Sequence, residues 1–201
     1  MTILALGPVT NVATVLKNHP ELVRRIREIV VVAGRQPDQH FRSSRKQKQP
    51  FRDFNFEMDP LSFQVLLDSR VEITLTPWEV SSKVWLRQGD LKLLREGNGA
   101  TEWLWGPAED WLHLWQEQFH VDGFNPFDTL TVGYVLSPRW FQWEDFPVEI
   151  RSLPDDVNTD AQKDKPYLLA SKKIASNRIV RYCYSVSPEF KKDLMKRLLQ
   201  K

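Results

Sequence analysis

The feature that most constrains the fold is an unbroken apolar run from Ile29 to Ala33, which ends at Gly34. A strand that is apolar at every position is typical of a parallel sheet covered by helices on both faces. Similar strand-like runs at residues 2–6 and 71–76 lie on either side of it, and helical patterns separate the three. This β-α-β-α-β order predicts a three-layer α/β fold with a mainly parallel sheet flanked by helices.

The rest of the chain predicts further helices and strands around that sheet. Asp59 and Pro60 suit the cap and first turn of another helix. Helical patterns cover residues 8–18, 20–26, 79–86, 89–96, 101–119, 123–136 and 187–200, and strand patterns cover residues 148–151, 166–169 and 178–184. The sequence contains no internal repeat and no low-complexity linker, so we expect residues 1–201 to form a single domain.

Composition and charge exclude several classes of protein. The 201 residues are 41% apolar and carry a net charge of only +2, which argues against nucleic acid as an obligatory partner. No apolar run approaches the roughly 20 residues of a membrane span, and the N-terminus lacks the basic start of a signal peptide, so we expect a cytoplasmic protein. The single cysteine, Cys183, excludes an internal disulfide, and its strand-like surroundings indicate a buried structural thiol.

A polar turn follows the first predicted strand. Residues 7–13 read Gly-Pro-Val-Thr-Asn-Val-Ala, in which Pro8 suits a first helical turn and Thr10 and Asn11 offer oxygen atoms. Open α/β sheets bind ligands beyond the carboxyl ends of their strands, where such turns lie. We therefore expect this turn to lie beside a binding site.

An acid and an amide precede the helix that begins at Pro60. Asp53 and Asn55 alternate with phenylalanines, so an extended backbone would point both polar side chains the same way. A carboxylate accepts hydrogen bonds and an amide both donates and accepts them, a combination that suits the hydroxyl groups of a sugar. The alternative is a helix-entry loop in which both side chains only cap backbone groups.

A lone acid lies in a third polar segment. Asp128 is the one acid between Gly123 and Val135, and a helical apolar run follows it. A carboxylate in this position either caps the helix or binds a cation beside the sheet.

Aromatic and basic side chains each allow two interpretations. Trp111 and Trp115 share one face of a predicted helix, which is typical of packing in a core or interface and less often of base stacking. The basic loop at residues 42–48 is either a solvated loop or a lid over a neighbouring site. An RNA-binding module that uses both features is a further alternative. Metal-ligand spacing is lacking for the histidines, which are His19, His40, His113 and His120.

Taken together and in this order, the three polar segments resemble the inosine-uridine preferring nucleoside hydrolase family. Residues 7–13 are similar to its GPLTNVA turn, and residues 28–34 are similar to its EIVVMGG strand apart from two positions. Residues 53–60 are similar to its EFNxxxDPEA motif. Phe127 and Asp128 stand where the family carries a His-Asp pair.

The resemblance implies hydrolysis of a ribonucleoside to base and ribose, in purine or pyrimidine salvage, with calcium as cofactor. It makes Thr10, through its carbonyl oxygen, and Asp128 calcium ligands, while Asp53 and Asn55 hold the ribose hydroxyls. The catalytic residues stay unassigned, because Phe127 replaces the family's histidine, which is often the acid for the leaving group. The family's acidic DxDxxxDD signature, the source of its base and of most calcium ligands, is absent from this sequence.

That absence implies a partial, N-terminally truncated nucleoside-hydrolase fold that matches the later two-thirds of the family. Asp155, Asp156 and Asp160 lie in a late loop and are poor substitutes for the missing signature. Since calcium takes about six to eight oxygen ligands, we expect calcium binding to be weak or lost. The alternative is that the chain is a catalytically inactive remnant, or half of a split hydrolase. Such a half would form an oligomer or bind a complementing chain that carries the acidic motif. An unpaired edge at residues 2–6 favours the split enzyme.

Overall fold

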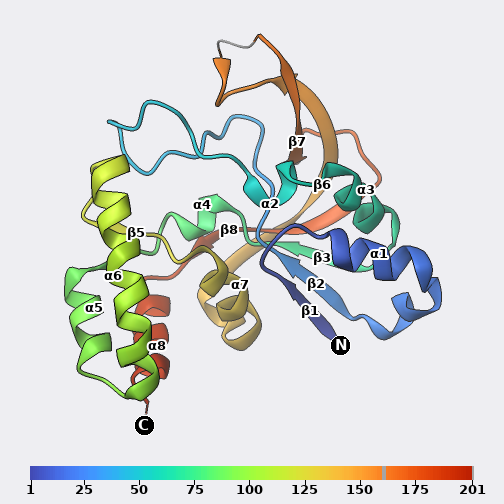
Figure 1. Ribbon diagram of the computed structural model, residues 1–201. Coiled ribbons are helices and arrows are strands. Elements are labelled where there is room, and N and C mark those ends of the chain that lie inside the picture. Colours follow the sequence, from blue (N-terminus) through green and yellow to red (C-terminus); the bar gives the residue numbers. More distant parts are fainter. Residues whose placement is uncertain (160–161, 201) are drawn as a thin grey trace.

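A six-stranded sheet forms the centre of the molecule (Figure 1). The computed structural model describes residues 1–159 and 162–200. In spatial order the strands are β1 (Thr2–Ala5), β2 (Glu28–Val31), β3 (Glu72–Leu75), β8 (Ile179–Val186), β6 (Phe141–Pro154) and β7 (Asp164–Ala170).

The sheet is parallel on one side and antiparallel on the other. Strands β1, β2, β3 and β8 run parallel to one another, whereas β6 is antiparallel to both β8 and β7. All four residues of β2, which are Glu28 and the first three residues of the apolar run at 29–33, are buried. The predicted β-α-β-α-β order and the α/β class, with a mainly parallel sheet, are confirmed.

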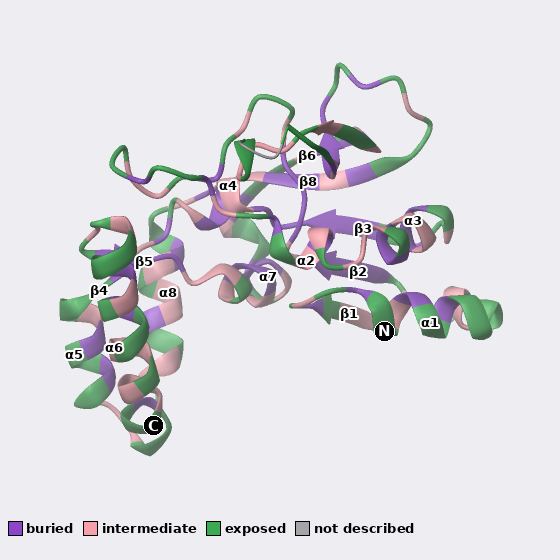
Figure 2. Cartoon of the chain, turned by 45° about the horizontal axis from the view of Figure 1, so that its top comes forward, coloured by how far each residue is buried: buried purple, intermediate pink, exposed green. Residues whose placement is uncertain are grey.

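Helices cover both faces of the sheet. The described helices against the sheet are α1 (Thr10–Asn18) and α3 (Pro60–Asp68) on one face, and α4 (Trp78–Ser81) and α7 (Phe127–Leu136) on the other. Figure 2 shows the result, with β2 and β3 buried between helices whose outer surfaces are exposed. As predicted, Asp59 caps α3 by accepting a hydrogen bond from the Ser62 amide, and Pro60 begins the helix.

Helices α5, α6 and α8 pack together beside the sheet. Next to them lies a two-stranded antiparallel sheet of β4 and β5. The bounds of these elements and of the remaining short helices are α5 (Gln88–Arg95), α6 (Gly99–Phe119), α8 (Glu189–Leu198), β4 (Leu86–Arg87), β5 (Gly123–Phe124), α2 (Phe54–Glu57), η1 (Pro20–Arg25) and η2 (Pro138–Trp140). Leu91, Leu112 and Trp115 are buried in the core that these helices share with Met195. This helical unit places one long helix, α6, along the side of the sheet (Figure 1).

Some predicted elements differ from the observed ones. The helix predicted over 79–86 ends at Ser81, because Leu86 and Arg87 pair instead with residues 123–124. The same pairing delays the helix predicted from residue 123 until Phe127. The strand predicted over 148–151 is the middle of a much longer strand, β6.

Two predictions about the chain as a whole can be compared with the fold. Cys183 is buried in β8, and burial raises the pKa of its thiol to about 12, as expected of a structural cysteine. Among the described residues, no helix combines the length and the apolar character that a membrane crossing needs.

Candidate functional site

A cavity of about 580 Å³ lies at the carboxyl ends of β1 and β2. Its walls come from the turns after these two strands, from α2, from the side of α6 and from the first turn of α7. This is the place where open α/β sheets bind ligands. Asp53, Asn55 and Asp128 all line this cavity, so the structure brings together three of the four predicted site residues.

Asp53 lies at the bottom of the cavity and is 7% exposed. Its Oδ2 atom accepts a hydrogen bond of 2.7 Å from the backbone amide of Gly34, directly after β2. Burial raises the pKa of Asp53 to about 6, although the Gly34 amide and the charge of Arg35 favour the ionised form. A buried carboxylate with a raised pKa in a cavity is typical of a functional acid rather than a structural one.

Asn55 lies two positions after Asp53, in α2. Its side chain is also held by the segment that follows β2. Its Nδ2 atom donates a hydrogen bond of 3.0 Å to the carbonyl of Val32. The prediction of an extended backbone was wrong, because residues 54–57 form the short helix α2 with Asp53 at its N-terminal end. The two side chains still line the same cavity, since Gly34 and Val32 hold one each.

Asp128 lies at the open side of the cavity, in the first turn of α7. Pro126 occupies the N-cap position of that helix, without a side-chain cap hydrogen bond, so Asp128 is not the cap. Burial alone raises its pKa, with no hydrogen bond or ion pair to another described residue. Of the two interpretations from the sequence, a carboxylate available to a ligand agrees better with the structure than a helix cap.

Thr10 is not among the residues that line the cavity. Its hydroxyl donates a hydrogen bond of 2.5 Å to Asp59, and its carbonyl accepts one from the hydroxyl of Thr14. The part of this turn that reaches the cavity is Leu6, Gly7 and Pro8. The structure therefore separates Thr10 from the other predicted site residues.

Aromatic rings form most of the remaining wall, and the sequence analysis did not assign several of them to the site. Trp115 is 1% exposed and belongs to the helical core, as its helical spacing with Trp111 indicated. Trp111 is 45% exposed and offers its ring to the cavity. Across the cavity, Phe41 and Trp78 stack with ring centroids 5.4 Å apart. Trp78 follows the end of β3, and that position was the signal that could have identified it.

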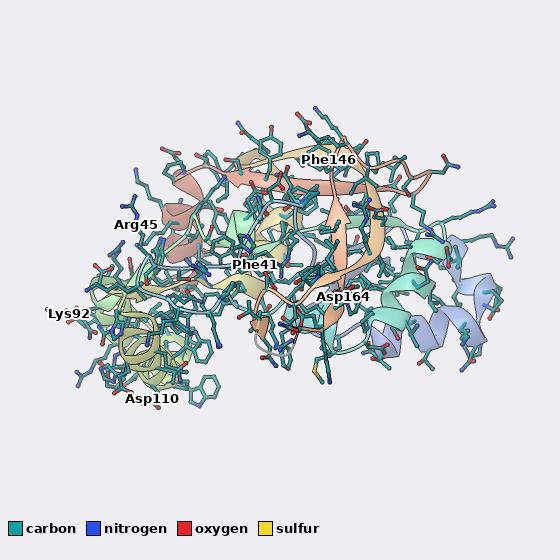
Figure 3. The ribbon with its side chains drawn as sticks, turned by 90° about the horizontal axis from the view of Figure 1, so that it is seen from above. Phe41, Arg45, Lys92, Asp110, Phe146 and Asp164 are labelled. Carbon is teal, nitrogen blue, oxygen red and sulfur yellow. The ribbon has the colours of Figure 1, made fainter. Side chains whose placement is uncertain are left out.

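Hydrogen bonds hold the backbone of the basic loop, while its charged side chains are exposed. The Ser44 hydroxyl donates to the carbonyl of Phe119 at the end of α6, and Gln47 is 6% exposed. Phe41 and Phe51, at its two ends, line the cavity and are joined by a backbone hydrogen bond of 2.7 Å. Figure 3 shows Phe41 near the centre of the molecule and Arg45 toward its edge.

A buried ion-pair cluster supports the helix that carries Asp53 and Asn55. It consists of Arg35, Glu57, Asp156 and Lys165, which come from four separate segments. The Arg35 side chain is 3% exposed, pairs with Asp156 at 2.7 Å and lies over the ring of Phe41. Lys165 pairs with Glu57 at 2.6 Å and with Asp156 at 3.0 Å.

The ion-pair cluster also keeps Asp156 ionised and holds the backbone of Asp53. Burial disfavours the charge of Asp156, but Arg35 and Lys165 outweigh it and hold the pKa of Asp156 well below its usual range. Glu57 accepts a hydrogen bond of 3.2 Å from the backbone amide of Asp53. The acids of the late loop at 155–156 are therefore structural partners of cations, while Asp160 lies outside the described residues.

The carboxylates and carbonyls present do not make a complete calcium site. Calcium takes about six to eight oxygen ligands, several of them carboxylates. Among residues 1–159 and 162–200, no three His, Cys, Asp or Glu side chains group closely enough to hold a metal ion. Asp53 already accepts the Gly34 amide, which leaves Asp128 as the carboxylate of the cavity that has no partner within the described chain.

The chain is similar to pyrimidine-specific ribonucleoside hydrolases RihA of Klebsiella pneumoniae (strain 342) and Citrobacter koseri, with 26% identity to each over 143 residues. Those matches cover 70% of this chain but 44% of each relative, so the chain spans less than half the length of these curated proteins.

Solved structures show the same fold. A plant nucleoside hydrolase superposes with a TM-score of 0.80 at 17% identity, covering 100% of this chain and 62% of that one. A purine-preferring ribonucleoside hydrolase from Gardnerella vaginalis gives a TM-score of 0.72 at 18% identity, covering 98% of this chain and 60% of that one. The model of the inosine-uridine preferring nucleoside hydrolase family matches residues 1–180, and the chain belongs to that family.

Proposed function

We propose that this chain is the nucleoside-binding part of a ribonucleoside hydrolase. In this proposal the ribose lies at the bottom of the cavity, where Asp53 accepts hydrogen bonds from its hydroxyls and Asn55 donates and accepts them. The base lies against the aromatic wall that includes Trp111 and the Phe41–Trp78 pair. The observation that carries the proposal is that Asp53, Asn55 and Asp128 line one cavity with these rings.

The chemistry of the reaction explains why the grip on the sugar matters. Cleavage of an N-glycosidic bond passes through an oxocarbenium-like state, and hydrogen bonds to the sugar hydroxyls strengthen as that state forms. Asp53 is well suited to this task, because a buried carboxylate accepts hydrogen bonds in a medium of low dielectric constant. Phe127 has no proton to give, so this chain offers no leaving-group acid at that position.

Calcium enters the proposal through Asp128. Its carboxylate is the cavity's candidate calcium ligand, and we retain Thr10 only as a second candidate because its carbonyl already accepts the Thr14 hydroxyl. A bound calcium ion would supply charge and would orient a water molecule for attack on the sugar. The described residues do not fit a complete site, so we assign no step of the reaction to calcium in this chain alone.

A second candidate function, half of a split enzyme, is supported by the exposed edge of the sheet. Strand β1 is the last strand on its side, and Leu4 and Leu6 are 37% and 41% exposed. Leu6 also lines the cavity, so a strand added at this edge would bring its side chains close to Asp128. We propose a complementing chain, or a second copy, that supplies carboxylates there. Sedimentation of the chain and of Leu4→Lys tests this: the split-enzyme proposal requires an assembly that the variant loses.

Binding of uridine and inosine, measured by calorimetry, tests the main proposal. We expect both to bind, and we expect Asn55→Ala to weaken binding by about tenfold through loss of one or two hydrogen bonds. Asn18→Ala, at the exposed end of α1, is the matched control and should leave binding unchanged. Release of free base, followed by chromatography, measures hydrolysis in the same samples. Absence of any nucleoside binding would overturn the proposal.

We also propose a cytoplasmic location. The support is the single buried thiol, Cys183, which needs no oxidising compartment.

A further inference from the structure

A second hollow, of about 490 Å³, adjoins the cavity on the side of the basic loop. Phe51, Gln118 and Phe119 line both spaces, so these three residues form their common wall. Beyond them the second hollow is lined by Lys46, Lys48 and His120, among other residues. An apolar, aromatic space and a basic space are therefore immediate neighbours.

The cations of the basic loop have no acidic partner in the described chain. Nearby, His40 and Arg52 do form ion pairs with the acids of the cluster. By contrast, no described carboxylate lies within ion-pair distance of Arg42, Arg45, Lys46 or Lys48. These side chains concentrate positive charge in one loop of a chain whose net charge is only +2.

The backbone that carries Lys46 and Lys48 is fixed. Between them lies Gln47, which is 6% exposed and accepts a hydrogen bond from the Ser43 amide while it donates one to the Gln49 carbonyl. The Ser44 hydroxyl joins the same turn to Phe119. The two exposed lysines therefore project from a turn whose centre is buried, so little backbone ordering is needed when an anion binds.

From this juxtaposition we propose that the second hollow binds a phosphate group and that the ligand is a nucleoside 5′-monophosphate. The inference rests on the proposed function, which places the nucleoside in the cavity. A phosphate monoester carries about −1.5 to −2 charges at pH 7 and three acceptor oxygens, which two lysines can neutralise and bind. Because Asp53 and Asn55 hold the 2′ and 3′ hydroxyls in that proposal, the 5′ position is the one free to carry the phosphate.

A single nucleotide agrees with the observations better than a nucleic acid strand. Binding of a strand needs a basic groove that follows several phosphates and further stacking positions. Here the unpaired cations gather in one loop beside one cavity, and the net charge of the whole chain is close to zero. The ligand is therefore one base, one ribose and one phosphate.

Calorimetry on the full chain at low salt tests the proposal with adenosine, its 5′-monophosphate and its 3′-monophosphate. We expect the 5′-monophosphate to bind at least about tenfold more tightly than adenosine, since hydrogen bonds to charged groups contribute about 1.5–3 kcal/mol. The 3′-monophosphate should show no such gain. In the double variant Lys46→Gln/Lys48→Gln the gain should disappear, while adenosine binds as before.

The control variant is Lys17→Gln/Lys196→Gln, which removes the same charge from exposed positions on α1 and α8. It should retain the preference for the 5′-monophosphate. If adenosine binds and the 5′-monophosphate binds no more tightly, the phosphate site is wrong and the proposed function stands. If neither binds although uridine or inosine does, this inference alone fails, whereas absence of binding by all of these nucleosides overturns the proposed function as well. If a single-stranded oligonucleotide binds more tightly than the 5′-monophosphate and with a strong salt dependence, the ligand is a nucleic acid strand and the nucleotide proposal is wrong.

Discussion

The ion-pair cluster and the neighbouring cavity with its basic loop differ in whether their charged side chains are paired. In the ion-pair cluster, Arg35 and Lys165 are nearly buried, and each lies against at least one carboxylate. Around the cavity and the basic loop, Asp128 and the lysines of residues 46–48 have no partner of opposite charge among the described residues. The first region pairs its charges within the chain, whereas the second leaves its charges unpaired among the described residues.

The comparison separates residues that position the site from residues whose side chains are available to a ligand. A buried charge without a partner costs several kcal/mol, so pairing explains how Arg35 and Lys165 remain inside the protein. Asp53 lies between the two regions, because its backbone amide is held by Glu57 while its carboxyl lines the cavity. Its raised pKa shows that this carboxyl is placed at a cost to stability.

Breaking the cluster should have the largest effect on stability. We expect Arg35→Met to lower the free energy of unfolding by about 3–5 kcal/mol, because it removes one partner of a buried pair. The exposed pair of Lys172 and Glu144 supplies the control, and Lys172→Met should cost less than about 1 kcal/mol. Urea denaturation measures both. Equal losses in the two variants would show that the cluster is no more important than a surface pair.

Neutralising Asp53 should stabilise the protein at neutral pH. The folded-state pKa of about 6 lies above the ordinary value of 3.8, so the folded protein binds the extra proton and loses stability as pH rises from about 4 to 6. Asp53→Asn removes this loss, and we expect a gain of about 2–3 kcal/mol at pH 8 that vanishes near pH 4. Thermal denaturation across this pH range measures it, with the exposed acid of Asp38→Asn as control. A variant less stable than the native chain at pH 8 contradicts this account of Asp53.

Removing an aromatic ring from the cavity should affect binding without affecting stability. We expect Trp111→Ala to weaken nucleoside binding by about tenfold, since stacking on one base contributes about 1–3 kcal/mol. Trp103→Ala, on the same helix but outside the cavity and 76% exposed, is the control. If calorimetry finds the same affinity for both variants, the base does not lie against Trp111.

The smallest effect is expected at Asp128. Without a partner in the described chain, its carboxylate contributes little to folding, so Asp128→Asn should change the free energy of unfolding by less than about 0.5 kcal/mol. Thermal denaturation without added metal measures this. A loss above about 1 kcal/mol would reveal a structural role, such as a cap, that the structure does not show.

Local patterns in the sequence were sufficient for the parallel part of the fold. The apolar run at 29–33 and the Asp59–Pro60 helix start depend on neighbours in the chain, and both appear in the structure. The alternation at residues 53–56 was misleading, because the short helix α2 exposes 61% of Phe54 and buries Phe56 completely. Side-chain spacing over four residues cannot separate a strand from one helical turn.

Contacts between distant segments could not be predicted from the sequence. Thr10 is bound by Asp59, which lies 49 positions away, and Arg35 is bound by Asp156, 121 positions away. Nothing near Thr10 indicated that its hydroxyl was already engaged. Likewise, Phe41 and Trp78 face the cavity because separate segments bring them together, not because of any spacing between them.

The most direct test of the central claim is the affinity of the native chain for a ribonucleoside and for its 2′,3′-dideoxy analogue. If Asp53 and Asn55 hold the sugar hydroxyls, calorimetry will show the analogue binding at least about tenfold more weakly, because both hydroxyl contacts are lost. Equal affinity for the two compounds would contradict the account, since it would mean that the acid and the amide of the cavity do not recognise ribose.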